Sequence, residues 1–112
     1  MKSINDYVNA AYQNAVEKGW WDDPRSVGEL IALMHSELSE ALEEHRKGLQ
    51  PNELYYNENK PEKPEGISTE LADCVIRIFD FCGRYDIDLE KIIDTKMEYN
   101  SKRSYRHGNK VI

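Results

Sequence analysis

The amino-acid sequence predicts a single all-α domain built from four helices. The chain has 112 residues, an ordinary length for one domain. Apolar residues recur at helical spacing along most of it, whereas valines and isoleucines never form a sustained alternating run, so no sheet is expected. Capping residues, glycines and prolines divide the helical pattern into four segments.

The first half of the chain contains two predicted helices. The first covers residues 3–18, where isoleucine, tyrosine, valine and alanine recur on one side. A turn follows at 20–24. Ser26 and Glu29 then have capping-box spacing, in which each side chain satisfies a backbone N–H of the other residue. The second helix is therefore expected over 26–47.

The second half begins with a segment that cannot be helical throughout. Residues 49–66 hold three prolines among polar residues, which predicts a long surface loop. The third helix is expected over 67–85. Asp88 is a suitable N-cap for a fourth helix over 89–104, and the tail 105–112 is basic.

Composition restricts the partners and the compartment. The formal net charge of −6 argues against binding to duplex nucleic acid, which requires a basic face. The two cysteines, Cys74 and Cys82, lie about 12 Å apart along one predicted helix, too far for a disulfide. With no signal peptide and no long apolar run, we expect a cytoplasmic protein with no membrane partner.

Acidic residues occupy positions on the second helix that should be apolar. Glu37 lies between Leu33 and Ala41 within the apolar stripe, and Glu40 and Glu44 lie inside the stripe or at its edge. A buried carboxylate without a partner costs several kcal/mol, so a cation should meet these side chains.

The third helix carries a second acidic pair, Glu70 and Asp73, along one margin of its own apolar stripe. If the two stripes pack together, four carboxylates converge on one pocket. Ligands that are all oxygen suit Mg²⁺ or Mn²⁺. An acidic pair of this spacing is usually solvent-exposed when it stands alone, and Asp73 could simply pair with Arg77. The two pairs on successive helices together favour the metal site.

The sequence resembles a known family at these positions. The acidic motifs are similar to the E-x-x-E…E-x-x-D signature of MazG-like nucleoside triphosphate pyrophosphohydrolases. The motifs are Glu37-Leu38-Ser39-Glu40 and Glu70-Leu71-Ala72-Asp73. The likeness continues through residues 85–89 and 96–103 and covers about 20–110. Residues 41–69 form a longer spacer than is usual in the family.

The resemblance implies an oligomeric, four-helix bundle-like MazG-type fold and a hydrolytic reaction. Such enzymes cleave a nucleoside triphosphate to a nucleoside monophosphate and pyrophosphate. By the same resemblance, Glu37, Glu40, Glu70 and Asp73 would bind Mg²⁺, and Glu37 or Glu40 would act as the catalytic base.

Two further groups are candidate substrate contacts. Lys96, Asn100 and Arg103 share one face of the predicted fourth helix and are suited to phosphate oxygens, although they could be ordinary exposed side chains. Trp20 and Trp21 could stack on the nucleobase, or they could cap the core.

Two other classes of function are weighed against the hydrolase. A carboxylate-bridged di-metal oxidoreductase is disfavoured because no histidine follows a glutamate by three residues. A non-enzymatic helical interaction module stays open, and metal dependence would distinguish it from the enzyme.

The predicted helices also leave apolar side chains without a partner. On the second helix these are Ile31, Leu38 and Leu42, and the first helix adds Tyr7, Val8 and Tyr12. Such surfaces are usually buried between subunits, which predicts a homodimer or homotetramer. The resemblance also implies paired subunits with pockets near their interface.

Overall fold

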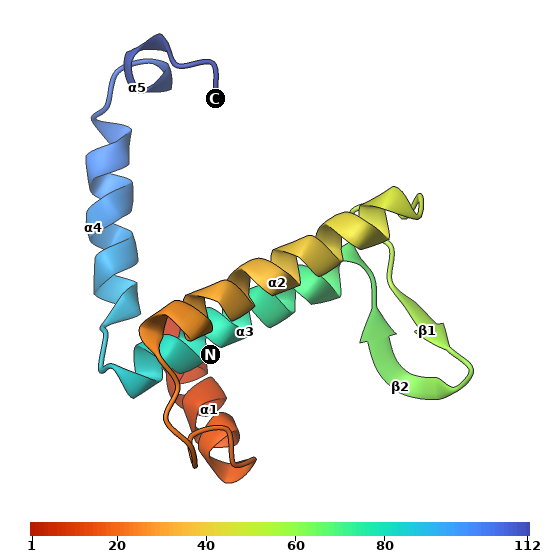
Figure 1. Ribbon diagram of the computed structural model, residues 1–112. Helices are drawn as coiled ribbons and strands as arrows, with labels where there is room; N and C mark the ends of the chain where they lie inside the picture. The colour runs from red at the N-terminus through yellow and green to blue at the C-terminus, as the bar shows by residue number, and fades with distance from the viewer.

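The computed structural model describes residues 1–112 and is mostly helical (Figure 1). Its elements, in chain order, are α1 (Ile4–Glu17), α2 (Val27–Arg46), β1 (Tyr55–Asn57), β2 (Lys60–Glu65), α3 (Ile67–Arg84), α4 (Leu89–Ser101) and α5 (Arg106–Asn109). The predicted helical class is therefore confirmed, and the four long helices lie close to their predicted positions. None of the helices combines the length and apolarity needed to cross a membrane.

Side-chain caps fix where three of the four long helices begin. The Ser26 hydroxyl accepts a hydrogen bond from the Glu29 N–H at 3.1 Å, which is one half of the expected capping box. Ser3 and Asp6 form a complete capping box at α1. At α4 the Asp88 carboxylate accepts from the Lys91 N–H at 3.2 Å.

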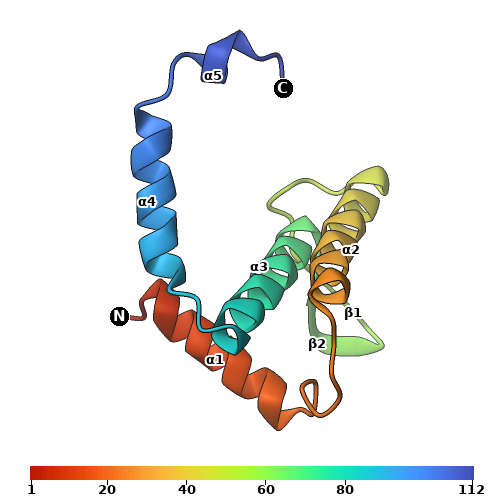
Figure 2. The same cartoon turned by 60° about the vertical axis from the view of Figure 1, so that its left-hand side comes forward.

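Three of the helices form the packed part of the molecule. Helices α2 and α3 lie side by side and antiparallel, and α1 crosses α3 (Figures 1 and 2). The buried apolar residues are small or medium in size: Val8, Ala15, Leu30, Ala41, Cys74 and Cys82. The expectation that Val8 lacks a partner within the chain is therefore wrong. Both cysteines are free thiols, as their spacing predicts. Because no large side chain is fully buried, much apolar surface stays exposed.

The crossing of α1 and α3 depends on Gly83. A Cβ atom at this position would overlap the side chain of Tyr12. Glycine therefore lets the two helix backbones approach one another closely.

Helix α4 leaves the other three and projects away from them (Figure 2). Its start is tied to α1 through Asn5, whose Nδ2 donates to Asp88 Oδ1 at 2.9 Å and whose backbone N–H donates to Glu90 Oε1 at 3.3 Å. No residue of α4 is buried. One chain alone therefore does not close the four helices into a bundle.

The expectation of no sheet is wrong. Strands β1 and β2 form an antiparallel hairpin, with Tyr55 opposite Glu65 and Asn57 opposite Lys60. The hairpin is almost wholly exposed, so its sequence needs no apolar alternation. A two-stranded ribbon has free edges, where the prolines of β2 are tolerated. The predicted exposure of this segment is confirmed.

Gly66 makes the connection from the hairpin to α3. Its φ of +134° is a conformation that side chains rarely adopt, and a Cβ atom there would collide with the carbonyl oxygen of Glu53. The position therefore requires glycine.

Candidate functional site

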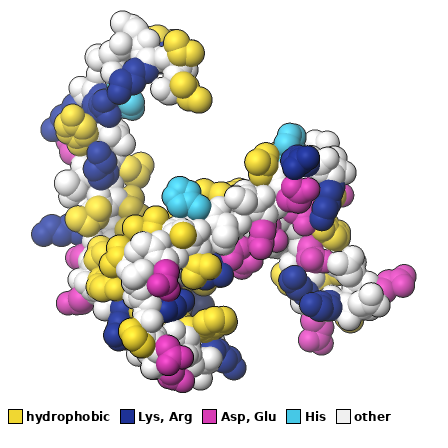
Figure 3. Space-filling view, viewed as in Figure 1, with side chains coloured by type: hydrophobic (Ala, Val, Ile, Leu, Met, Phe, Trp, Pro, Cys, Tyr) yellow, Lys and Arg dark blue, Asp and Glu magenta, His cyan; other side chains and the backbone are white.

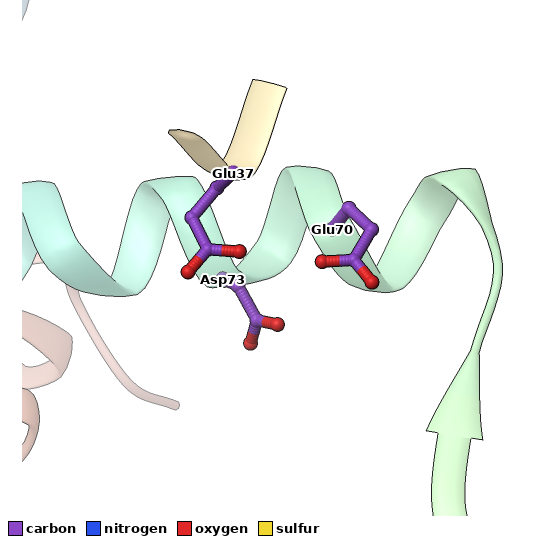
Figure 4. Close-up of side chains that lie close together, drawn as sticks. All are labelled: Glu37, Glu70 and Asp73. Atoms are coloured by element: carbon purple, nitrogen blue, oxygen red, sulfur yellow. The ribbon is translucent and has the colours of Figure 1, made fainter. Parts of the chain in front are cut away.

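Three of the four predicted metal ligands come together between α2 and α3. One carboxylate oxygen each of Glu37, Glu70 and Asp73 lies within 4.8 Å of the others (Figure 4). Glu70 and Asp73 share one side of α3 because they are three residues apart. Glu37 reaches them from α2 because the apolar stripes of the two helices face each other. We call these three residues the acidic cluster.

Glu37 is the most buried member of the acidic cluster, with 7% of its surface exposed. Arg77 Nε donates a hydrogen bond to Glu37 Oε1 at 2.8 Å. The second oxygen, Oε2, is buried without a hydrogen-bond partner, and so is Oε2 of Glu70. Buried oxygens without donors are unusual in folded proteins, and a cation would satisfy both.

The charges in the acidic cluster repel one another. Burial raises the pKa of Glu70 to about 7, and the adjacent Glu40 and Asp73 add to the shift. Burial and the charge of Glu37 also raise the pKa of Asp73, although Arg77 opposes this. Two unsatisfied oxygens within a group of crowded carboxylates fit a hard divalent cation such as Mg²⁺ or Mn²⁺.

Glu40, the fourth predicted ligand, lies beside the acidic cluster. It is near enough to raise the pKa of Glu70, yet its side chain is exposed and no oxygen of it belongs to the close group. The structure thus brings three of the four acids together and leaves Glu40 next to them with solvent access.

Glu44 lies one turn further along α2 and has a partner that the sequence did not indicate. The Tyr55 hydroxyl, from β1, lies 3.0 Å from one oxygen of the buried Glu44 carboxylate and 2.9 Å from the other. This hydrogen bond raises the pKa of Tyr55 to about 12. It fastens the hairpin to the end of α2 that lies beyond the acidic cluster.

A cavity of about 320 Å³ opens beside the acidic cluster, between α1, α3, the middle of α2 and the segment that precedes α2. Glu37 and Asp73 are in its wall. The other residues lining it are Ala11, Asn14, Ala15, Trp20, Arg25, Ile76, Arg77 and Asp80. The cavity therefore joins acids that can hold a metal to two arginines, apolar walls and one indole ring.

Arg25 and Asp80 are not among the residues predicted from the sequence, and Arg77 is predicted only as a possible partner of Asp73. For Arg77 and Asp80, the spacing along α3 does indicate a shared face with the acids. Asp73, Arg77 and Asp80 recur at intervals of four and three residues, so they continue the face that begins at Glu70. Arg25 precedes α2 and carried no comparable signal.

The two predicted base-binding tryptophans have different surroundings. Trp20 lines the cavity and is 64% exposed. Trp21 is held in place: its Nε1 donates to Asp80 Oδ1 at 2.8 Å, and the guanidinium groups of Arg25 and Arg84 lie 4.4 and 4.8 Å from its ring centre. Trp20 therefore has a free face for a ligand, whereas Trp21 supports the wall.

The predicted phosphate-binding residues lie elsewhere in the single chain. Lys96 and Asn100 are exposed on α4, which points away from the acidic cluster, and Arg103 is exposed two residues beyond the end of this helix (Figure 1). The charged groups of Lys96 and Arg103 lie 5.1 and 5.7 Å from the ring centre of Tyr99. Within one chain α4 does not bring these three side chains to the cavity.

The chain matches no protein-family model, no curated protein and no solved structure.

Proposed function

We propose that this protein is a Mg²⁺-dependent nucleoside triphosphate pyrophosphohydrolase. The observation that carries the proposal is the acidic cluster, in which two buried oxygens, one on Glu37 and one on Glu70, have no hydrogen-bond partner. The resemblance of the two acidic motifs to MazG-like enzymes supplies the reaction class. The adjoining cavity supports it, because it offers cationic and apolar surface beside the acids.

In this proposal Glu37, Glu70 and Asp73 hold the metal, with Glu40 beside them. Bound Mg²⁺ would neutralise phosphate charge and lower the pKa of a coordinated water. Glu37 is buried and engaged by Arg77, whereas Glu40 is exposed to solvent, so Glu40 is the better candidate for the base. Water is added across the α–β anhydride bond. Glu40 accepts the proton, and pyrophosphate leaves from the nucleoside monophosphate.

The cavity would hold the rest of the nucleotide. Arg77 has N–H groups beyond the one that binds Glu37, and these can donate to phosphate oxygens. The exposed face of Trp20 is suited to stacking on the base.

We also propose that the active form is a homodimer or homotetramer. Ile31, Leu38 and Leu42 of α2 are 42%, 46% and 58% exposed. An apolar groove of about 560 Å³ runs between α1 and α3, next to the cavity. Figure 3 shows hydrophobic side chains gathered where α4 leaves the packed helices. A second copy would cover these surfaces, and its α4 would carry Lys96, Asn100 and Arg103 to the cavity.

The function is tested by measuring pyrophosphate release from a panel of ribo- and deoxyribonucleoside triphosphates with Mg²⁺. At least one nucleotide should be hydrolysed. Glu37→Gln and Asp73→Asn should each lower the rate at least about a hundredfold, because each removes a negative ligand. Glu43→Gln is the matched control, since Glu43 is an exposed acid on the same helix that pairs with Arg46. Full activity in the Glu37 or Asp73 variant would refute the site.

The exposed apolar surface also favours a second candidate, a non-enzymatic interaction module. In that case the acids are structural, and neither Mg²⁺ nor a nucleotide changes the protein. A melting temperature that does not respond to millimolar Mg²⁺ with nucleotide, together with no hydrolysis, would favour the module.

A further inference from the structure

Arg25 and Asp80 form an incompletely satisfied pair in the cavity wall. Arg25 lies just before α2 and Asp80 lies on α3, and each side chain is only 16% exposed. The distance from Arg25 Nη2 to Asp80 Oδ2 is 3.8 Å, close enough for attraction between the charges but too long for a hydrogen bond. Polar atoms of both side chains therefore remain available for hydrogen bonds with a ligand.

The unused groups are a donor and an acceptor placed side by side. Arg25 Nε and Nη2 are buried without hydrogen-bond partners. Asp80 Oδ1 accepts from Trp21 Nε1 at 2.8 Å, whereas Oδ2 accepts no hydrogen bond. Buried donors without acceptors are energetically unfavourable. A ligand that accepts hydrogen bonds from them therefore binds more tightly by the free energy of those hydrogen bonds.

The chemistry of the pair discriminates between parts of a nucleotide. A phosphate group offers only acceptors, and the Asp80 carboxylate would repel it. The edge of a nucleobase offers an acceptor next to an N–H donor, which matches an arginine beside a carboxylate. The neighbouring cavity wall is apolar, with Ala11, Ala15 and Ile76, and suits a planar ring.

The position of Asp80 along α3 agrees with a base site at this pair and a phosphate site at the acidic cluster. Asp80 is seven residues from Asp73, which corresponds to about 10 Å along the helix axis. A ligand whose phosphates lie at the acidic cluster can therefore extend within the same cavity to Arg25 and Asp80.

The pair is also held rigidly. The Trp21 indole hydrogen-bonds to Asp80, and the Arg25 guanidinium lies 4.4 Å from the centre of the same ring. A rigid donor and acceptor select between ligands better than mobile ones, because little ordering is needed on binding.

We infer that Arg25 and Asp80 are specificity-determining residues that read the hydrogen-bonding edge of the nucleobase. Arg25 donates to an acceptor on the base, and Asp80 Oδ2 accepts from an adjacent N–H. The inference rests on the proposed function in that it takes the ligand to be a nucleotide.

The test compares dissociation constants of the full-length protein for ATP, GTP, CTP and UTP with Mg²⁺, measured by calorimetry. Arg25→Gln should reduce the ratio between the weakest and the tightest nucleotide about tenfold, the value of one hydrogen bond to a charged group. Asp80→Asn keeps an oxygen for Trp21 but can present an amide donor in place of Oδ2. It should therefore change the order of preference among the four bases.

Arg84→Gln is the matched control. Arg84 also lies over the Trp21 ring, at 4.8 Å, but it does not line the cavity. This variant should leave the ratios between nucleotides unchanged. Arg25→Lys, which keeps the charge, should also lose base discrimination, and it replaces Arg25→Gln if circular dichroism shows that Arg25→Gln is unfolded.

The outcomes separate this inference from the proposed hydrolysis. If Arg25→Gln and Asp80→Asn weaken all four nucleotides by one common factor, the pair contacts phosphate or only supports the fold, and the inference is overturned. If the wild-type protein binds nucleotides and the variants change the ranking, but no pyrophosphate is released, the inference stands and the hydrolase proposal fails. If the wild-type protein binds no nucleotide, both are overturned.

Discussion

At the scale of single residues, the interaction between Glu37 and Arg77 is the most informative. Arg77 Nε is the only hydrogen-bond donor to the buried Glu37 carboxylate. Arg77→Gln should therefore lower the free energy of unfolding by about 1–3 kcal/mol in the absence of metal. Millimolar Mg²⁺ should recover part of this loss, because the cation can neutralise the buried negative charge of Glu37 that Arg77 no longer pairs with. Urea unfolding in EDTA and in Mg²⁺ measures both effects.

Arg46→Gln provides the control for this prediction. Arg46 pairs with Glu43 at 3.2 Å on the exposed side of α2, and such surface pairs contribute at most about 1 kcal/mol. If the two arginine variants were equally stable in EDTA, Arg77 would not compensate the charge of Glu37.

Sequence reasoning identified the acids of the site but not their partners. Glu37, Glu70 and Asp73 could be recognised because carboxylates stood within or beside apolar stripes. The hydrogen bond of Arg77 goes to Glu37 on another helix, and spacing within one helix gives no information about such contacts. Arg25 could not be found in this way, because its position depends on the turn that precedes α2.

At the scale of secondary-structure elements, a partly buried hydrogen bond between Tyr55 and Glu44 joins the hairpin to α2. Tyr55→Phe would leave the buried Glu44 carboxylate without its hydroxyl donor. We expect the free energy of unfolding to fall by about 1–3 kcal/mol. Urea denaturation at neutral pH, far below the raised pKa of Tyr55, measures the loss with the hydroxyl protonated.

Tyr56→Phe is the control for the hairpin. Tyr56 is 54% exposed, and its hydroxyl makes no hydrogen bond, so the change in stability should stay within about 0.5 kcal/mol. Equal losses in the two variants would mean that Glu44 does not depend on Tyr55.

The long helices could be predicted from sequence, whereas the hairpin could not. Helices α1 to α4 have recurring apolar residues, and α1, α2 and α4 also have side-chain caps; these are local signals. Strands β1 and β2 are exposed, so no alternation of apolar and polar residues marks them, and the prolines argued against strands. What stabilises the hairpin is its own ladder and the contact of Tyr55 with Glu44, eleven residues away.

At the scale of the whole molecule, the main question is what α4 contacts. Its residues are all at least partly exposed, and it leads two of the predicted phosphate ligands, and Arg103 just beyond its end, away from the cavity of its own chain. If a second copy supplies them, Glu37→Gln and Arg103→Ala affect sites built from different chains. Mixing the two inactive variants should restore roughly a quarter of wild-type activity, because half of randomly mixed dimers are hybrids with one intact site.

The mixing experiment has its own control. Light scattering of the wild-type protein should give a multiple of the 13.1 kDa chain mass. A mixture that stays inactive after unfolding and refolding together, or an active species with the mass of one chain, would contradict the shared site.

The central claim is that the acidic cluster holds Mg²⁺ for cleavage of a nucleoside triphosphate at its α–β bond. The most direct measurement is ³¹P nuclear magnetic resonance of a nucleoside triphosphate panel incubated with the wild-type protein, with Mg²⁺ and with EDTA. We expect that, with Mg²⁺ and without EDTA, at least one triphosphate is replaced by equal amounts of pyrophosphate and nucleoside monophosphate. Release of orthophosphate with a nucleoside diphosphate, or unchanged spectra for every nucleotide in the presence of Mg²⁺, would contradict it.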